Sequence, residues 1–86
     1  MVSREIEIVN ETGLHTRPGK RFVDEAKKCA CDVLVRKDEV EYNAKSLLKL
    51  LKAGISKGNR ITIVCDGEGE SEALESLCNF VATLQE

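Results

Sequence analysis

Apolar and polar residues follow two different periods in the first part of the chain. Residues 2–9 alternate, which predicts a strand with one mostly buried face. From residue 16 to residue 28 the spacing becomes helical, with Pro18, Phe22, Val23 and Ala26 on one face. Proline is tolerated there because a first helical turn does not need its N–H. Residues 32–36 and 40–43 flank a turn-like segment, so we expect a hairpin whose charged second strand lies at a sheet edge.

The second half contains two helical patterns and one strand. Ser46 is placed to cap a short helix over 47–52 that Gly54 ends. Residues 60–65 are crowded with apolar side chains and predict a central strand, and residues 70–84 predict the longest helix. The order β-α-β-β-α-β-α predicts an α+β fold in which three helices cover one face of a four-stranded, mainly antiparallel sheet. A chain of 86 residues is expected to form a single domain over 1–86.

Composition excludes some functions. The aromatic residues are Phe22, Tyr42 and Phe80, too few for a base-stacking surface, so we expect no direct nucleic-acid binding. No apolar run approaches the roughly 20 residues of a membrane span, so we expect no membrane insertion. All 13 Lys and Arg lie within residues 1–60, whereas residues 61–86 carry acidic charge alone. This asymmetry has two interpretations, two solvated faces or a cationic docking surface for an acidic protein.

The four cysteines indicate a reducing compartment. Cys29, Cys31, Cys65 and Cys78 form no C-x-x-C pair, and the N-terminal residues have no apolar signal segment. We therefore expect free, mostly buried thiols and a cytoplasmic location. An alternative is a small metal-binding, ferredoxin-like module that uses Cys29 and Cys31, although their spacing is not the usual one for zinc.

The only histidine, His15, is the strongest candidate for chemistry. It lies between a strand pattern and a helix pattern, with Gly13 before it and Arg17 and Pro18 after it. A helix N-terminus and a guanidinium together favour an anion, so a nucleophilic imidazole here points to phosphoryl transfer on the histidine itself. The alternative is a capping or hydrogen-bonding histidine without chemistry. A metal site or a hydrolytic triad is disfavoured, because His15 has no evident ligand or nucleophile beside it.

The segment around Ser46 is the second candidate. Ser46 fits a plain N-cap, and the same position would tolerate a phosphoryl group. A six-residue helix cannot bury Leu47, Leu48, Leu50 and Leu51 together, so we expect two in the core and the others exposed near Lys45, Lys49 and Lys52. An apolar patch rimmed by lysines is suited to protein docking, although ordinary surface leucines are the alternative.

Two motifs resemble those of the histidine-containing phosphocarrier family, HPr, of the bacterial sugar phosphotransferase system. The first is Gly13-Leu14-His15-Thr16-Arg17-Pro18 followed by Phe22-Val23, and the second is Asn43-Ala44-Lys45-Ser46-Leu47-Leu48-Lys49-Leu50-Leu51 with Gly54. Gly58 and Gly67 match as well, so the resemblance covers essentially the whole chain. It implies an open-faced β-sandwich.

The resemblance also implies a function for each motif. His15 would accept a phosphoryl group on Nδ1 from enzyme I and pass it to IIA domains of sugar permeases, with Arg17 contacting the group and Thr16 and Pro18 at the stabilising helix start. Ser46 would be modified by HPr kinase/phosphorylase, and the phosphoserine form would bind a catabolite-control repressor. The expected partner-docking residues are Lys20, Arg21, Leu47, Leu48, Lys49 and Leu51.

Such a protein is a phosphoryl carrier rather than a stand-alone enzyme, and we expect a monomer without cofactor or metal. An alternative within the same family is a mainly regulatory protein that signals through Ser46. The sequence departs from the family pattern at Thr16 and Gly19, which stand where alanine is frequent. Glycine lowers helix propensity, so we expect Gly19 to loosen the first helical turn.

Overall fold

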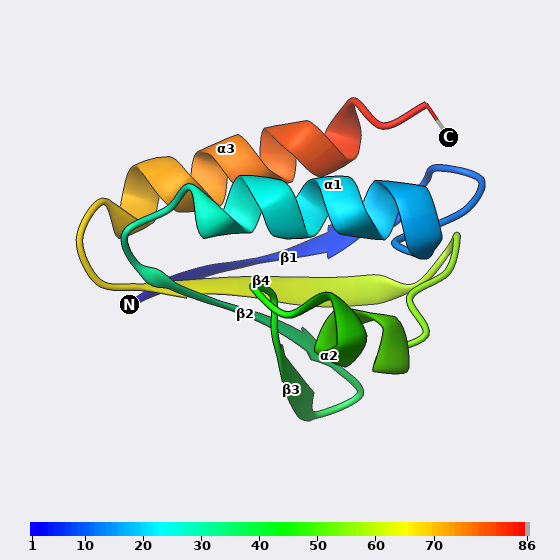
Figure 1. The fold of residues 1–86 in the computed structure, drawn as a ribbon, viewed down its shortest axis with the longest axis horizontal. Coiled ribbons are helices and arrows are strands. Elements are labelled where there is room, and N and C mark those ends of the chain that lie inside the picture. Colours follow the sequence, from blue (N-terminus) through cyan, green and yellow to red (C-terminus); the bar gives the residue numbers. More distant parts are fainter. Residues whose placement is uncertain (86) are drawn as a thin grey trace.

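The sheet is built around β4 (Arg60–Asp66), its most apolar strand. In the computed structural model, which describes residues 1–85, β4 pairs with β1 (Val2–Glu7) on one side and with β2 (Asp32–Lys37) on the other. The short strand β3 (Val40–Asn43) pairs with β2 at the edge, giving the order β1-β4-β2-β3 with every pairing antiparallel (Figure 1). The predicted hairpin, central strand and edge strand are confirmed.

Three helices cover one face of the sheet; the first two connect strands and the third follows the last strand. They are α1 (Thr16–Lys27), α2 (Leu47–Lys52) and α3 (Glu70–Ala82). Figure 1 shows α1 and α3 side by side across the sheet, with α2 beside the β2–β3 hairpin. The opposite face is open to solvent and carries polar side chains such as Glu5, Arg36 and Thr62. The predicted α+β open-faced sandwich is therefore confirmed.

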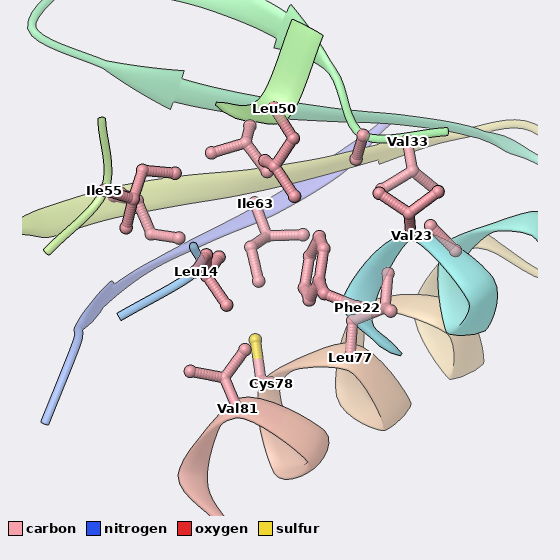
Figure 2. Close-up of a cluster of buried hydrophobic side chains, with 14 of the residues drawn as sticks. Leu14, Phe22, Val23, Val33, Leu50, Ile55, Ile63, Leu77, Cys78 and Val81 are labelled. Carbon is pink, nitrogen blue, oxygen red and sulfur yellow. The ribbon is translucent and has the colours of Figure 1, made fainter. Parts of the chain in front are cut away.

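The core lies between the helices and the inward face of the sheet. Phe22 of α1, Leu50 of α2 and Leu77 of α3 meet Ile63 of β4 in one cluster of buried side chains (Figure 2). Leu14, from the loop before α1, points into the same cluster and is 1% exposed. Because Leu14 before His15 and Phe22 after it are both anchored in this core, the position of His15 is set by the fold.

Some predicted boundaries differ from the structure. The first strand ends at Glu7 rather than at residue 9, and Ile8 enters the core while Val9 is exposed. The last helix ends at Ala82 rather than at residue 84, although Leu84 still packs against the core. Periodicity predicted both Ile8 and Leu84 to be buried, which is confirmed, but the chain buries them from irregular segments beyond the ends of the strand and the helix.

The longest helix, α3, has 13 residues. Among residues 1–85, none of the helices combines the length and the apolar character that a transmembrane helix requires.

Candidate functional site

His15 stands immediately before the first turn of α1. It is the N-cap residue, with an extended backbone (φ −91°, ψ 163°), and its carbonyl accepts the first helical hydrogen bond from the N–H of Gly19 at 3.0 Å. The N–H groups of residues 16 and 17 precede that bond, so the helix itself offers them no carbonyl. The half-buried imidazole therefore lies at the positive end of a 12-residue helix, where an anion is favoured.

Gly13 brings the loop of His15 against the segment before β4. Its φ is +61°, and a Cβ atom placed on it would lie 2.3 Å from the carbonyl oxygen of Ile55 and 2.7 Å from Cα of Ser56. The next residue, Leu14, donates its N–H to the same Ile55 carbonyl at 3.1 Å. The buried Asn10 side chain donates from Nδ2 to the Gly13 carbonyl at 2.8 Å. Glycine is therefore required here by a close backbone approach as well as by its conformation.

This approach places Ser56 beside the imidazole. The distance between His15 Nε2 and Ser56 Oγ is 3.0 Å, a hydrogen bond across 41 positions of sequence. We did not predict Ser56 from the sequence, because it precedes an ordinary Lys57-Gly58 turn and no local pattern relates it to His15. Only the docking of the two loops, both at the same end of the molecule in Figure 1, brings the residues together.

The predicted residues of the helix start have different environments. Thr16 and Arg17 are exposed, whereas Pro18 is one of the buried residues of α1. Thr16 has φ +26°, a value that L-residues rarely adopt and that is costly for a β-branched side chain. The chain therefore holds strain directly after the candidate histidine.

Gly19 has a structural role besides its low helix propensity, and its loosening of the first turn stays a prediction. Its N–H bonds to His15, and a Cβ atom on it would lie 2.6 Å from the carbonyl oxygen of Leu14. The same added atom would lie 3.8 Å from Cδ2 of Leu51, so α1 and α2 meet at this point. Gly19 thus permits a tight turn and close helix packing, two effects that a propensity scale does not contain.

Ser46 caps α2 as predicted. Its Oγ accepts the N–H of Lys49 at 3.4 Å, and its carbonyl accepts the N–H of Leu50 at 3.0 Å. Gly54, with φ +60°, follows the end of this helix. Lys37 caps the same end, since its ammonium donates to the carbonyls of Ala53 at 2.9 Å and Gly54 at 3.2 Å.

The leucines of α2 are buried less than we predicted. Leu50 alone is fully buried, Leu47 and Leu51 are half-buried, and Leu48 is 76% exposed. A helix of six residues makes fewer than two turns, and about one residue per turn faces the sheet directly, so full burial is limited to one or two side chains. Leu51 lies where α2 meets α1, near Gly19, and Leu47 packs against the edge of the core.

The lysine and arginine side chains expected to dock a partner differ in the ion pairs and hydrogen bonds that they already make. Lys20 pairs with Asp24 at 3.2 Å on the exposed face of α1, and the Arg21 guanidinium lies 5.6 Å from the ring centroid of Phe80. Lys49 is exposed. Lys45 differs from the prediction, because it is half-buried and its ammonium donates to the carbonyl of Cys29 at 2.9 Å. Lys45 therefore fixes the loop after α1 and does not join a cationic rim.

The cysteines are free thiols, as expected. Cys31, Cys65 and Cys78 are buried, Cys29 is half-buried, and burial raises the pKa of Cys65 to about 12. Within residues 1–85 no three His, Cys, Asp or Glu side chains are grouped so that they could hold a metal ion. In this part of the chain, therefore, no arrangement favours the metal-binding alternative.

Comparison with known proteins gives a consistent result. Residues 2–83 match the family described as PTS HPr component phosphorylation site. The chain is 40% identical over 85 residues to the phosphocarrier protein HPr of Haemophilus influenzae, covering 99% of this chain and 100% of that protein. It is 41% identical over 81 residues to the HPr-like protein Crh of Bacillus subtilis, covering 94% and 95% respectively.

Solved structures agree with the sequence comparison. HPr-C-His from Thermoanaerobacter tengcongensis superposes with a TM-score of 0.94 at 37% identity, covering 96% of this chain and 93% of that chain. The solution structure of Crh, described as the Bacillus subtilis catabolite repression HPr, gives a TM-score of 0.70 at 40% identity, covering 99% and 98%. The chain therefore belongs to the HPr family of phosphocarrier proteins of the phosphotransferase system.

Proposed function

We propose that this protein carries a phosphoryl group on His15, accepting it from enzyme I and passing it to IIA domains of sugar permeases. The observation that supports this most is the half-buried imidazole at the positive end of α1, with Nε2 bonded to Ser56. Such a ring can turn its other nitrogen toward an incoming donor. N–H dipoles at the helix end favour the developing negative charge, and Arg17 would add a guanidinium.

Docking of these partners is proposed on α1 and α2. Leu47, Leu48 and Leu51 offer partly or fully exposed apolar surface, and Lys49, Lys20 and Arg21 contribute positive charge. The two helices approach each other closely at Gly19 and Leu51, which supports one continuous surface beside His15. A partner with an apolar centre and an acidic rim fits this surface, and charge would speed encounter more than it deepens affinity.

The carrier function is tested by phosphorylation of the purified chain. Incubation with enzyme I and labelled phosphoenolpyruvate is expected to give an acid-labile label on the wild type and on Ser46→Ala, but not on His15→Ala. Transfer from the labelled chain to a IIA domain then tests the second step. Acid-labile label that persists in His15→Ala would refute the assignment of the phosphorylated residue.

A regulatory role at Ser46 is a second candidate, favoured by the similarity to Crh and by the capping geometry of Ser46. HPr kinase/phosphorylase would modify the Ser46 hydroxyl. The phosphoryl group would add negative charge beside the docking leucines, and so weaken binding of an acidic partner while creating a site for a repressor. ATP with the kinase is expected to give an acid-stable label that Ser46→Ala abolishes and Ser71→Ala retains. Acid-stable label that persists in Ser46→Ala would contradict this role.

We also propose that the chain acts in the cytoplasm as a monomeric single domain. Free thiols, three of them buried, suit a reducing compartment. Sedimentation at micromolar concentration tests the oligomeric state, and a stable dimer would contradict it.

A further inference from the structure

The hydrogen bond between His15 Nε2 and Ser56 Oγ does more than hold a side chain in place. A neutral imidazole has its proton on one nitrogen and its lone pair on the other, and the partner of one nitrogen decides the state of both. We infer that Ser56 is a positioning residue for phosphoryl transfer, because its Oγ accepts a hydrogen bond from Nε2–H and so keeps the nucleophilic lone pair on Nδ1. This inference rests on the proposed carrier function.

The position of Ser56 is fixed by its surroundings, independently of His15. Its backbone N–H donates to Oδ1 of Asn59 at 2.8 Å, and its carbonyl accepts the N–H of Asn59 at 3.0 Å. The turn is joined to the end of β1, where Ile8 donates to the Asn59 carbonyl at 2.8 Å and accepts from the Gly58 N–H at 2.7 Å. A hydroxyl held in this way can select one ring orientation.

The acceptor role is also consistent with the exposure of the serine. Ser56 is exposed, so its own hydroxyl proton can be donated to water while a lone pair faces Nε2. His15 is half-buried, and the ring is less free to obtain the same hydrogen bond from solvent. Ser56 thus provides the imidazole with a fixed acceptor on the side opposite the attacking nitrogen.

The same bond becomes stronger during transfer. The Nδ1 lone pair forms the bond to phosphorus, and the bond from phosphorus to the donor atom breaks, with its electron pair returning to the donor. Nε2 keeps its proton, so the ring acquires positive charge beside the phosphoryl dianion. A hydrogen bond from a charged ring N–H is stronger than one from a neutral ring, and Ser56 therefore stabilises the phosphorylated state more than the free state.

The tautomer can be observed without any transfer reaction. Long-range ¹H–¹⁵N spectra of the full chain with labelled histidine, recorded at about pH 9 where an ordinary histidine is neutral, distinguish the protonated from the unprotonated ring nitrogen. The wild type and Ser56→Thr are expected to show a proton on Nε2, whereas Ser56→Ala is expected to show a mixture of tautomers. Ser76→Ala, which removes an exposed hydroxyl from α3, is the matched control and is expected to match the wild type.

Transfer from phosphorylated enzyme I gives the second measurement. Loss of one hydrogen bond of ordinary strength predicts a rate about three- to tenfold lower in Ser56→Ala, and Ser56→Thr is expected to stay within about twofold of the wild type. A wild-type proton on Nδ1, or a Ser56→Ala protein with unchanged tautomer and rate, would overturn the inference. Absence of acid-labile label on the wild type would instead contradict the carrier function, and the spectra would still decide the role of Ser56.

Discussion

Replacement of Gly13 by alanine separates two reasons for a glycine at one position. The first reason is conformational, since φ of Gly13 is +61° and an L-residue in the left-handed region costs about 1–2 kcal/mol. The second is steric, because the added Cβ would lie 2.3 Å from the Ile55 carbonyl oxygen, far inside a normal contact of about 3.5 Å. The nearest atoms, the carbonyl oxygen of Ile55 and Cα of Ser56, both belong to the backbone. The backbone of one of the two loops must therefore move to accommodate alanine.

Gly54 provides a matched control for this experiment. Its φ is +60°, and a Cβ atom there would meet no atom within 4 Å. The Gly54→Ala variant therefore has the same conformational cost, and the same reduction in unfolded-state entropy, without the steric term. Overpacking of this kind costs about 1–3 kcal/mol, so we expect Gly13→Ala to be less stable than Gly54→Ala by that amount.

Urea unfolding followed by far-ultraviolet circular dichroism measures the difference. The comparison is valid when both variants keep the slope of the free energy against urea, because an unchanged slope means that the same surface is exposed on unfolding. Gly13→Ala is also expected to move His15 away from Ser56, which the tautomer spectra would detect. If the two variants lost equal stability, the close approach of Gly13 to Ile55 would not constrain the loop and the reasoning would fail.

Three further predictions concern other parts of the fold. Lys37→Met removes the ammonium that caps the two carbonyls at the end of α2, so we expect a loss of about 1–2 kcal/mol in thermal unfolding, whereas the exposed Lys52→Met should change little. The backbone N–H of Gly67 and then the N-terminal ammonium hold the pKa of Glu70 below its ordinary value of 4.5. The ionised carboxylate therefore stabilises the fold above pH 4.5, and this contribution is lost as pH falls through the lowered pKa. In Glu70→Gln the free energy of unfolding should fall less steeply on acidification than in the wild type. An unchanged dependence on pH would contradict the assignment. Finally, iodoacetamide at about pH 8 should modify Cys29 first in the native protein, because the other thiols are buried, and equal rates at all four cysteines would show that the core opens.

The sequence predicts the architecture well because the fold uses regular periods. Helical spacing in residues 16–28 and apolar crowding in residues 60–65 both correspond to the observed elements, and the placement of Ser46 at the start of α2 follows from its capping chemistry. Side-chain burial in α2 was predicted less accurately, because periodicity gives the direction of a side chain and not the depth of the surface it meets. Leu51 shows this, since its half-buried position depends on the approach of α1 at Gly19.

The candidate site could be predicted only in part. His15 was identified because a lone histidine beside a glycine, an arginine and a helix start is a local pattern. Ser56 could not be identified in this way, since its contact with His15 arises from the registration of two loops that are distant in sequence. The strain at Thr16 likewise could not be predicted from the sequence, because a positive φ at a threonine is imposed by tertiary structure against local preference.

The balance of charge around His15 suits a group that must be received and released. A phosphoryl dianion next to several fixed, desolvated cations would be held too tightly for a transfer protein, whereas helix N–H dipoles and one guanidinium stabilise it modestly. The nearby cations are arranged accordingly: Lys20 is paired with Asp24, and Arg21 lies over Phe80. These side chains remain on the surface where a partner can reach them, so the proposed carrier uses them to attract another protein and leaves the binding of the phosphoryl group to the helix end, Arg17 and the imidazole that Ser56 orients.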